Sequence, residues 1–104
     1  LKSSKTPELY SSDSLFLVIN ASDTAWINVE KDNSIKEEFL LYPRGKKELT
    51  AKDNFILVIG NSGGVTLSLN NQPLEFNGRR RTVSRIAIDK NGLRYLDTQT
   101  QVNR

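Results

Sequence analysis

The middle of the chain places an apolar run, a glycine-rich break and an alternating run in succession, and this order most constrains the fold. Residues 55–59 (FILVI) are all apolar, as expected of a strand buried on both faces. Residues 60–64 (GNSGG) interrupt the run with side chains that tolerate positive φ. Apolar and polar residues then alternate over 65–69, the period of a half-buried strand. The asparagine pair at 70–71 can turn this strand back toward residues 74–76, which predicts antiparallel pairing.

Turn signals built from Gly, Pro, Asn and Asp recur about every 8 to 12 residues, as in all-β sandwiches and barrels. No segment of 11 or more residues has the periodicity of an amphipathic helix. We therefore predict an all-β fold, a single antiparallel β-sandwich of immunoglobulin-like type with about seven strands. In the strand over 82–88, the side chains of Val83, Ile86 and Ile88 are expected to face inward. The main expected strands are 15–19, 25–30, 35–42, 46–51, 55–59, 65–69 and 82–88, with a short one at 93–96.

The length of 104 residues is that of one domain. Residues 1–14 are rich in Ser and Lys and are interpreted as a linker or flexible arm. The β-sandwich domain is assigned to residues 15–97, and the polar residues 98–104 to a flexible tail. No stretch approaches the ~20 apolar residues that a membrane span requires.

The chain contains no Cys, Met or His, which removes thiol nucleophiles, disulfides, soft metal ligands and Ser-His-Asp chemistry. Glu37 and Glu38 are adjacent in an expected strand, so their carboxylates point to opposite faces and cannot share one substrate. The stretch 60–64 lacks the Lys-Ser/Thr pair and the following helix of a phosphate-binding loop. We therefore predict that the protein is not an enzyme, with no catalytic, cofactor-binding or metal-binding residues.

Positive charge is concentrated in the C-terminal quarter of the chain. Residues 79–104 hold seven of the 15 basic side chains and only two of the 12 acidic ones. The densest part is Arg79-Arg80-Arg81, followed by Arg85 and preceded by the tight-turn dipeptide Asn77-Gly78. Such a run is either a contact for phosphate or carboxylate groups or simply a solvated basic face. No aromatic residue is interleaved with these arginines, which disfavours nucleic-acid binding.

Trp26 is the only tryptophan in the chain. It could be a stacking platform for a sugar or base, or a large packing residue that closes one edge of the sandwich. The packing role is favoured, because no second aromatic residue lies two positions away on either side. The candidate partner-contact residues are Arg79, Arg80, Arg81, Arg85 and Trp26.

Three segments follow one another in a recognisable order. The first is AWINV at 25–29 and the second is LYPRGK at 41–46. The third and most specific joins the turn at 59–65 (IGNSGGV) to the asparagine turn at 69–74 (LNNQPL). Together they resemble the periplasmic C-terminal domain of RodZ-type proteins, a β-sandwich without an assigned activity. The signature residues of the resemblance are Gly60, Asn61, Gly63, Gly64, Asn70 and Asn71.

The chain departs from this family pattern in three places. Glu37 and Glu38 stand where members often carry a Gly in the third strand. Asn71 stands where members often have the Gly of an Asn-Gly turn. The loop at 77–81 (NGRRR) is charged, whereas the family loop is usually Gly-rich and uncharged, so the resemblance implies no shared ligand there.

The resemblance implies a bitopic membrane protein with a cytoplasmic helix-turn-helix domain, one membrane span outside this chain and a periplasmic sandwich. Residues 1–14 would then be the end of the linker from the membrane. The implied function is a non-enzymatic scaffold that links the bacterial actin-like cytoskeleton to cell-wall synthesis and rod shape. Its expected partners are proteins of the cell-shape or wall-synthesis machinery, or an anionic wall polymer. The alternative is a carbohydrate-binding module for peptidoglycan that uses Trp26, Tyr42 and the arginine run.

Overall fold

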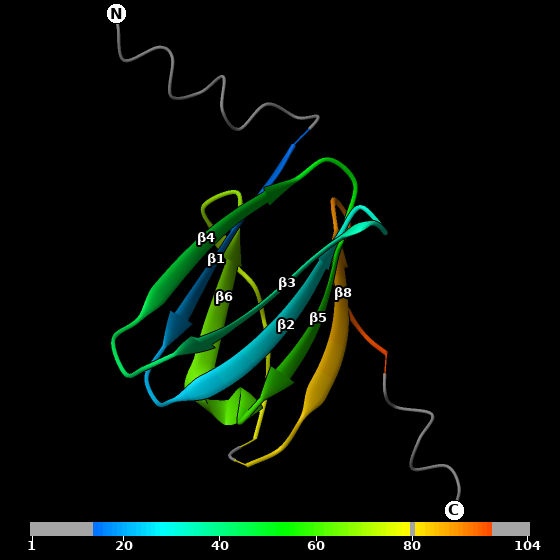
Figure 1. Cartoon of the computed structure of the whole chain (residues 1–104). Helices are drawn as coiled ribbons and strands as arrows, with labels where there is room; N and C mark the ends of the chain where they lie inside the picture. Colours follow the sequence, from blue (N-terminus) through cyan, green and yellow to red (C-terminus); the bar gives the residue numbers. More distant parts are fainter. Residues whose placement is uncertain (1–13, 80, 97–104) are drawn as a thin grey trace, which may run out of the picture.

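A computed structural model of the chain describes residues 14–79 and 81–96. Within these ranges the backbone forms nine β-strands and one short 3-10 turn, η1 (Ser62–Gly64) (Figure 1). No helix in the described ranges is long and apolar enough to cross a membrane. The predicted arm and tail lie outside the described residues, apart from Ser14. The strands are β1 (Leu15–Ala21), β2 (Ala25–Lys31), β3 (Ile35–Leu41), β4 (Lys46–Ala51), β5 (Phe55–Gly60), β6 (Val65–Leu69), β7 (Gln72–Pro73), β8 (Ser84–Asp89) and β9 (Gly92–Tyr95).

The strands form two sheets that lie as two layers (Figure 1). One sheet has the order β4-β1-β6-β7 and the other the order β3-β2-β5-β8-β9. All pairings are antiparallel. This arrangement confirms the predicted all-β antiparallel sandwich. The strand number exceeds the expected seven or so because the short strands β7 and β9 extend one edge of each sheet.

One apolar core fills the space between the two sheets. Every second side chain of β1, β2, β5 and β6 points into it, which is the period that a half-buried strand imposes. Burial of each large apolar side chain is worth about 1.5–3 kcal/mol, so a shift in register would expose many of them at once. The largest fully buried side chains are Phe55, Leu17, Ile19, Ile27, Leu57, Ile59, Ile86, Ile88 and Val29.

Strand β5 is buried on one face only, which corrects the prediction made from its unbroken apolar run. Leu57 and Ile59 are fully buried, whereas Ile56 and Val58 are partly exposed on the outer face. β5 lies at the centre of the five-stranded sheet, between β2 and β8. Side chains of the two flanking strands therefore protect the apolar residues on its outer face from water in part, and leave them half-buried.

Two hairpin turns use polar residues with positive φ. Asn70 and Asn71 have φ values of 51° and 69° and join β6 to β7, which confirms the predicted asparagine turn. Asp32 and Asn33, with φ values of 52° and 62°, make the equivalent connection between β2 and β3. Short polar side chains occupy this left-handed conformation more readily than other non-glycine residues.

The segment between β7 and β8 differs from the prediction. Leu74 and Phe76 do not belong to a strand, although both pack against the core. Val83 was expected to face inward, but it is 56% exposed, because unbroken alternation in β8 turns Ser84, Ile86 and Ile88 inward and places Val83 on the outer side. Ile86 and Ile88 are fully buried, as predicted.

The connections between strands gather at two opposite ends of the sandwich (Figure 1). The described chain starts at Ser14 and enters β1 at one end, which we call the entry end. β1 then runs the length of the four-stranded sheet to the other end, which we call the arginine end. The entry end comprises residues 31–34, 51–54, 70–71 and 89–92, and the arginine end comprises residues 21–24, 42–45, 60–64, 77–79 and 81–83.

Candidate functional site

The glycine-rich turn after β5 (residues 60–64) and the arginine loop before β8 (described at residues 77–79 and 81–83) are one structural unit. The Ser62 N–H donates to the Thr82 carbonyl oxygen, and the Gly63 N–H donates to the Arg79 carbonyl oxygen, both at 2.9 Å. The Arg81 N–H donates to the Asn61 side-chain oxygen at 2.8 Å. The turn therefore holds the arginine loop through main-chain groups on both sides of the contact.

Ser62 lies at the centre of this unit and is fully buried. Its hydroxyl accepts from the Arg79 N–H at 3.2 Å and lies 3.3 Å from the Arg79 carbonyl oxygen. The Ser84 hydroxyl is 3.0 Å away. The Ser62 hydroxyl thus donates one hydrogen bond, to the Arg79 carbonyl oxygen, and accepts two, from the Arg79 N–H and the Ser84 hydroxyl. A hydroxyl can make no more than these three, so its hydrogen-bonding capacity is filled. Sequence reasoning missed both serines, because nothing in the sequence separates them from other serines near turns.

Two glycines allow the backbones of this unit to approach closely. A Cβ on Gly78 would lie 2.3 Å from the Ser62 carbonyl oxygen, and one on Gly64 would lie 2.9 Å from the Asp23 Cβ. The positive φ expected in the glycine-rich turn falls on Asn61, at 60°. Gly78 does not form the tight turn expected of the Asn-Gly dipeptide; it packs against η1 instead.

Asn61 also ties the unit to the connection between β1 and β2. Its side-chain amide donates to the Thr24 carbonyl oxygen at 2.8 Å and to the Asp23 carboxylate at 3.1 Å. Since its side-chain oxygen accepts from the Arg81 N–H, one asparagine joins three segments of the arginine end. The signature residue Asn61 thus positions the arginine loop.

The structure separates the predicted contact arginines. Arg79 and Arg81 lie in the loop with exposed side chains, and Arg81 has a φ of 58°. Among the described residues, the ion pairs are Lys31–Glu37 and Lys46–Glu48, and neither loop arginine takes part. Arg80 lies outside the described residues. Arg85 belongs to β8 and is paired in register with Val58, so it lies on the sheet and not in the loop.

Trp26 lies on the outer face of the five-stranded sheet and does not close a sheet edge. β2 runs between β3 and β5, and Trp26 is paired with Leu40 on one side and Gly60 on the other. The indole packs over Gly60, where an added Cβ would meet the Trp26 Cε3 at 3.4 Å. Its Nε1–H donates to the Glu38 carboxylate, and 37% of the residue is exposed. The ring is therefore held beside the arginine end by its contact with Gly60 and by the hydrogen bond to Glu38.

The asparagine half of the signature lies at the entry end. The Asn70 N–H donates to the Phe16 carbonyl oxygen, and the Phe16 N–H donates to the Asn70 side-chain oxygen, both at 2.8 Å. This reciprocal pair fixes the start of β1 to the end of β6. The signature residues thus clamp opposite ends of the sandwich and do not form one site.

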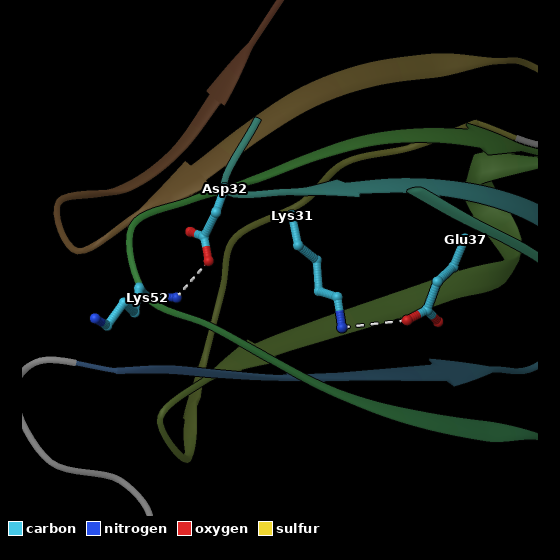
Figure 2. A network of polar contacts seen from close by, with 4 residues as sticks. All are labelled: Lys31, Asp32, Glu37 and Lys52. Carbon is cyan, nitrogen blue, oxygen red and sulfur yellow. Dashed lines mark hydrogen bonds and ion pairs between the residues drawn. The ribbon is translucent and has the colours of Figure 1, made fainter. Parts of the chain in front are cut away.

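A second clamp at the entry end is built on Asp32 (Figure 2). Its carboxylate accepts the backbone N–H groups of Lys52, Asp53 and Asn54 at 2.9, 2.6 and 3.1 Å. These hydrogen bonds, that of Lys52 first, hold the pKa of Asp32 below its ordinary value of 3.8. A separate ion pair nearby joins Lys31 of β2 to Glu37 of β3 at 3.1 Å (Figure 2).

The arginine end can present guanidinium groups on a fixed backbone to an anionic partner. A planar guanidinium pairs with carboxylate or phosphate through parallel hydrogen bonds. In the described part of the chain, no group of three or more His, Cys, Asp or Glu side chains could hold a metal ion.

Comparison with protein families gives one match. The model of the RodZ C-terminal domain family matches residues 18–87, from β1 to β8, and includes both signature turns and the arginine loop. Neither the curated proteins nor the solved structures gave a match.

Proposed function

We propose a function for this chain from the premise that it belongs to the RodZ C-terminal domain family, whose role is in cell shape. We propose that it is the periplasmic domain of a single-span membrane protein, and that it acts as a non-enzymatic scaffold. In this role it would link the bacterial actin-like cytoskeleton to cell-wall synthesis through contacts with proteins of the shape or wall machinery.

The fixed arginine loop is the observation that supports a binding role most strongly. Two main-chain hydrogen bonds, and a third from the Arg81 N–H to the Asn61 side chain, hold its described residues to the glycine-rich turn, while the Arg79 and Arg81 side chains remain exposed. Backbone groups that are already hydrogen-bonded before binding lose little conformational entropy when a partner arrives. The charge contact can therefore contribute to affinity.

The free edge of β3 is less suited to binding a partner strand. β3 is an edge strand of the five-stranded sheet and is largely exposed. It carries Lys36, Glu37 and Glu38 in succession. Charged residues on an edge strand oppose pairing with another chain. This favours the arginine loop over the β3 edge as the contact.

Replacing Arg79, Arg80 and Arg81 with Ser in the full-length protein tests the role of the loop. We expect cells that carry this variant to lose rod shape although the protein is present at its normal level. The matched control replaces the exposed lysines Lys36, Lys52 and Lys90 with Ser, which removes the same charge elsewhere. Normal shape in the arginine variant would remove the loop from the function, and normal shape after deletion of residues 15–96 would refute the scaffold role itself.

The exposure of Trp26 favours a second candidate, a carbohydrate-binding module for peptidoglycan. Its indole lies on the outer face of the sheet beside Gly60, and its Nε1–H donates to the Glu38 carboxylate. An exposed aromatic face can stack on a sugar ring. Titration with soluble wall fragments, followed by Trp26 fluorescence, is the test. Unchanged emission at millimolar ligand would eliminate a sugar site at this residue.

A further inference from the structure

We propose that the arginine end docks onto an acidic protein segment that also presents apolar side chains. The proposal rests on the scaffold function given above and adds a surface and a partner chemistry to it. The surface combines the arginine loop and Trp26 and Tyr42, which the sequence already suggested, with Leu40, Arg44 and Val83, which it did not. Its members are Trp26, Leu40, Tyr42, Arg44, Arg79, Arg81 and Val83.

Exposed apolar side chains are concentrated at this end. Six large apolar residues are exposed in the described part of the chain, and four of them, Trp26, Leu40, Tyr42 and Val83, lie here. Leu40 is the register partner of Trp26, and Tyr42 follows β3 at 63% exposure. Val83 lies next to the arginine loop and precedes the strand that pairs with β5. Apolar contact area is therefore continuous with the charged loop.

Arg44 brings a third guanidinium to the same end. It lies between β3 and β4 with a φ of 73°, and its N–H donates to the Ala21 carbonyl oxygen at 2.8 Å. The adjoining Ser22 N–H donates to the Gly64 carbonyl oxygen, also at 2.8 Å. These bonds continue the main-chain network that holds the arginine loop. Neither ion pair of the described residues includes Arg44.

The composition of this surface fits a protein partner better than a glycan. Tryptophan, tyrosine and arginine are the residues that contribute most to protein–protein binding energy. Leu40 beside Trp26 offers no hydrogen bond, so sugar hydroxyls placed over it would be left unpaired, at a cost. Acidic side chains on the partner would complement the arginines, and apolar ones would cover the exposed patch.

The position of the surface disfavours lipid head groups as its ligand. The described chain enters at Leu15, which pairs with Ala51 at the entry end. β1 then crosses seven residues, about 20 Å, to reach Ala21 at the arginine end. In a protein tethered through the chain that precedes β1, the arginine end would face away from the membrane.

Amide chemical shifts of the domain, followed by NMR during titration with a defined probe, test the proposal. The probe is a synthetic acidic peptide that forms a helix with Leu on one face. We expect shifts at residues 40–42, 44, 60–64 and 79–83. We expect binding to weaken about tenfold in Arg79→Ser/Arg81→Ser and in Leu40→Ser/Val83→Ser. The control Ile35→Ser/Lys52→Ser/Lys90→Ser, which removes apolar and basic side chains at the entry end, should bind like the parent protein.

Three competing ligands give the outcomes that would overturn the proposal. Equal binding of poly-glutamate would show that the apolar residues play no part. Tighter binding of soluble peptidoglycan fragments would assign the surface to a glycan, and tighter binding of phosphatidylglycerol vesicles would assign it to a membrane. All variants are first compared by urea unfolding, so that only folded proteins enter the titration.

A shape assay separates failure of this inference from failure of the scaffold function. The full-length protein with Leu40→Ser, Arg79→Ser and Arg81→Ser is expressed in cells that lack the parent protein. Loss of rod shape, with the entry-end control normal, is the expected result. Normal shape in this variant, combined with loss of shape on deletion of residues 15–96, would refute the docking surface and leave the scaffold function intact.

Discussion

Gly78 is the residue whose replacement should most disturb the arginine end without touching the core. An alanine Cβ at this position would lie 2.3 Å from the Ser62 carbonyl oxygen, so the loop must move away from η1. We expect Gly78→Ala to lower the free energy of unfolding by about 1–3 kcal/mol in urea denaturation, as for other overpacked sites. The control is Gly60→Ala, whose Cβ would make an ordinary contact at 3.4 Å and should change stability by less than about 0.5 kcal/mol. Equal losses in both variants would contradict the steric account.

Asp32 should stabilise the entry end in a pH-dependent way. Replacing the carboxylate with a neutral amide in Asp32→Asn, which keeps a residue suited to the φ of 52°, should cost about 1 kcal/mol at neutral pH, the scale of a lost side-chain cap. Because the folded-state pKa is lowered, this stabilisation is complete above the unfolded-state pKa, near 3.8, and disappears as the pH falls through the folded-state value. Urea unfolding at pH 7 and at successively lower pH values below 4 should show the two proteins converging.

The matched control for Asp32 is Asp53, which lies in the adjacent connection between β4 and β5. Asp53 is exposed, and its backbone N–H, not its carboxylate, takes part in the clamp. Asp53→Asn should therefore leave stability nearly unchanged at every pH. A constant difference between Asp32→Asn and the parent protein across the acid range would show that the charge of the carboxylate is not what stabilises the turn.

At the scale of the element, β5 offers neighbouring residues on opposite faces of one strand. Leu57 is fully buried in the core, whereas Val58 is partly exposed on the outer face. We expect Leu57→Ala to cost about 2–5 kcal/mol, because it removes a large side chain and leaves a cavity. Val58→Ala should cost about 1 kcal/mol or less. Comparable losses in urea unfolding would instead support the two-sided burial expected from the apolar run.

The sequence predicts the strands better than it predicts their surroundings. Alternation over 65–69 and the asparagine pair after it reappear as β6 and its turn, because both signals depend only on local geometry. Two predictions were wrong: that β5 is buried on both faces, and that the Val83 side chain points inward. The burial of β5 depends on what lies beside the strand, and the direction of Val83 depends on the unbroken register of β8 with β5; both are properties of the assembled sheets.

At the scale of the whole molecule, a single core predicts a single unfolding transition. Both sheets contribute to the same apolar cluster. The emission of Trp26, the only tryptophan, reports on the surroundings of the arginine end, and far-ultraviolet circular dichroism reports on all strands. The two urea curves should coincide. An earlier transition in the fluorescence would show that the arginine end unfolds separately from the sheets.

The candidate surface could be predicted only in part, because it assembles from distant parts of the chain. The arginine run and Trp26 are conspicuous in the sequence, and both lie at or beside the arginine end. Arg44, Leu40 and Val83 gave no signal, since each is unremarkable in its own segment. Only the pairing of β2 with β3 and β5, and of β5 with β8, brings these segments together.

The position of β1 has a mechanical consequence. β1 is hydrogen-bonded on both sides, to β4 and to β6, and it runs from the entry end toward the arginine end. A pulling force applied between Leu15 and the arginine loop acts along this strand. The force then loads the ladders on both flanks in shear, so that many bonds must fail together and the strand does not peel away one residue at a time. With its N-terminal strand held in this way, the sandwich can carry tension along its long direction.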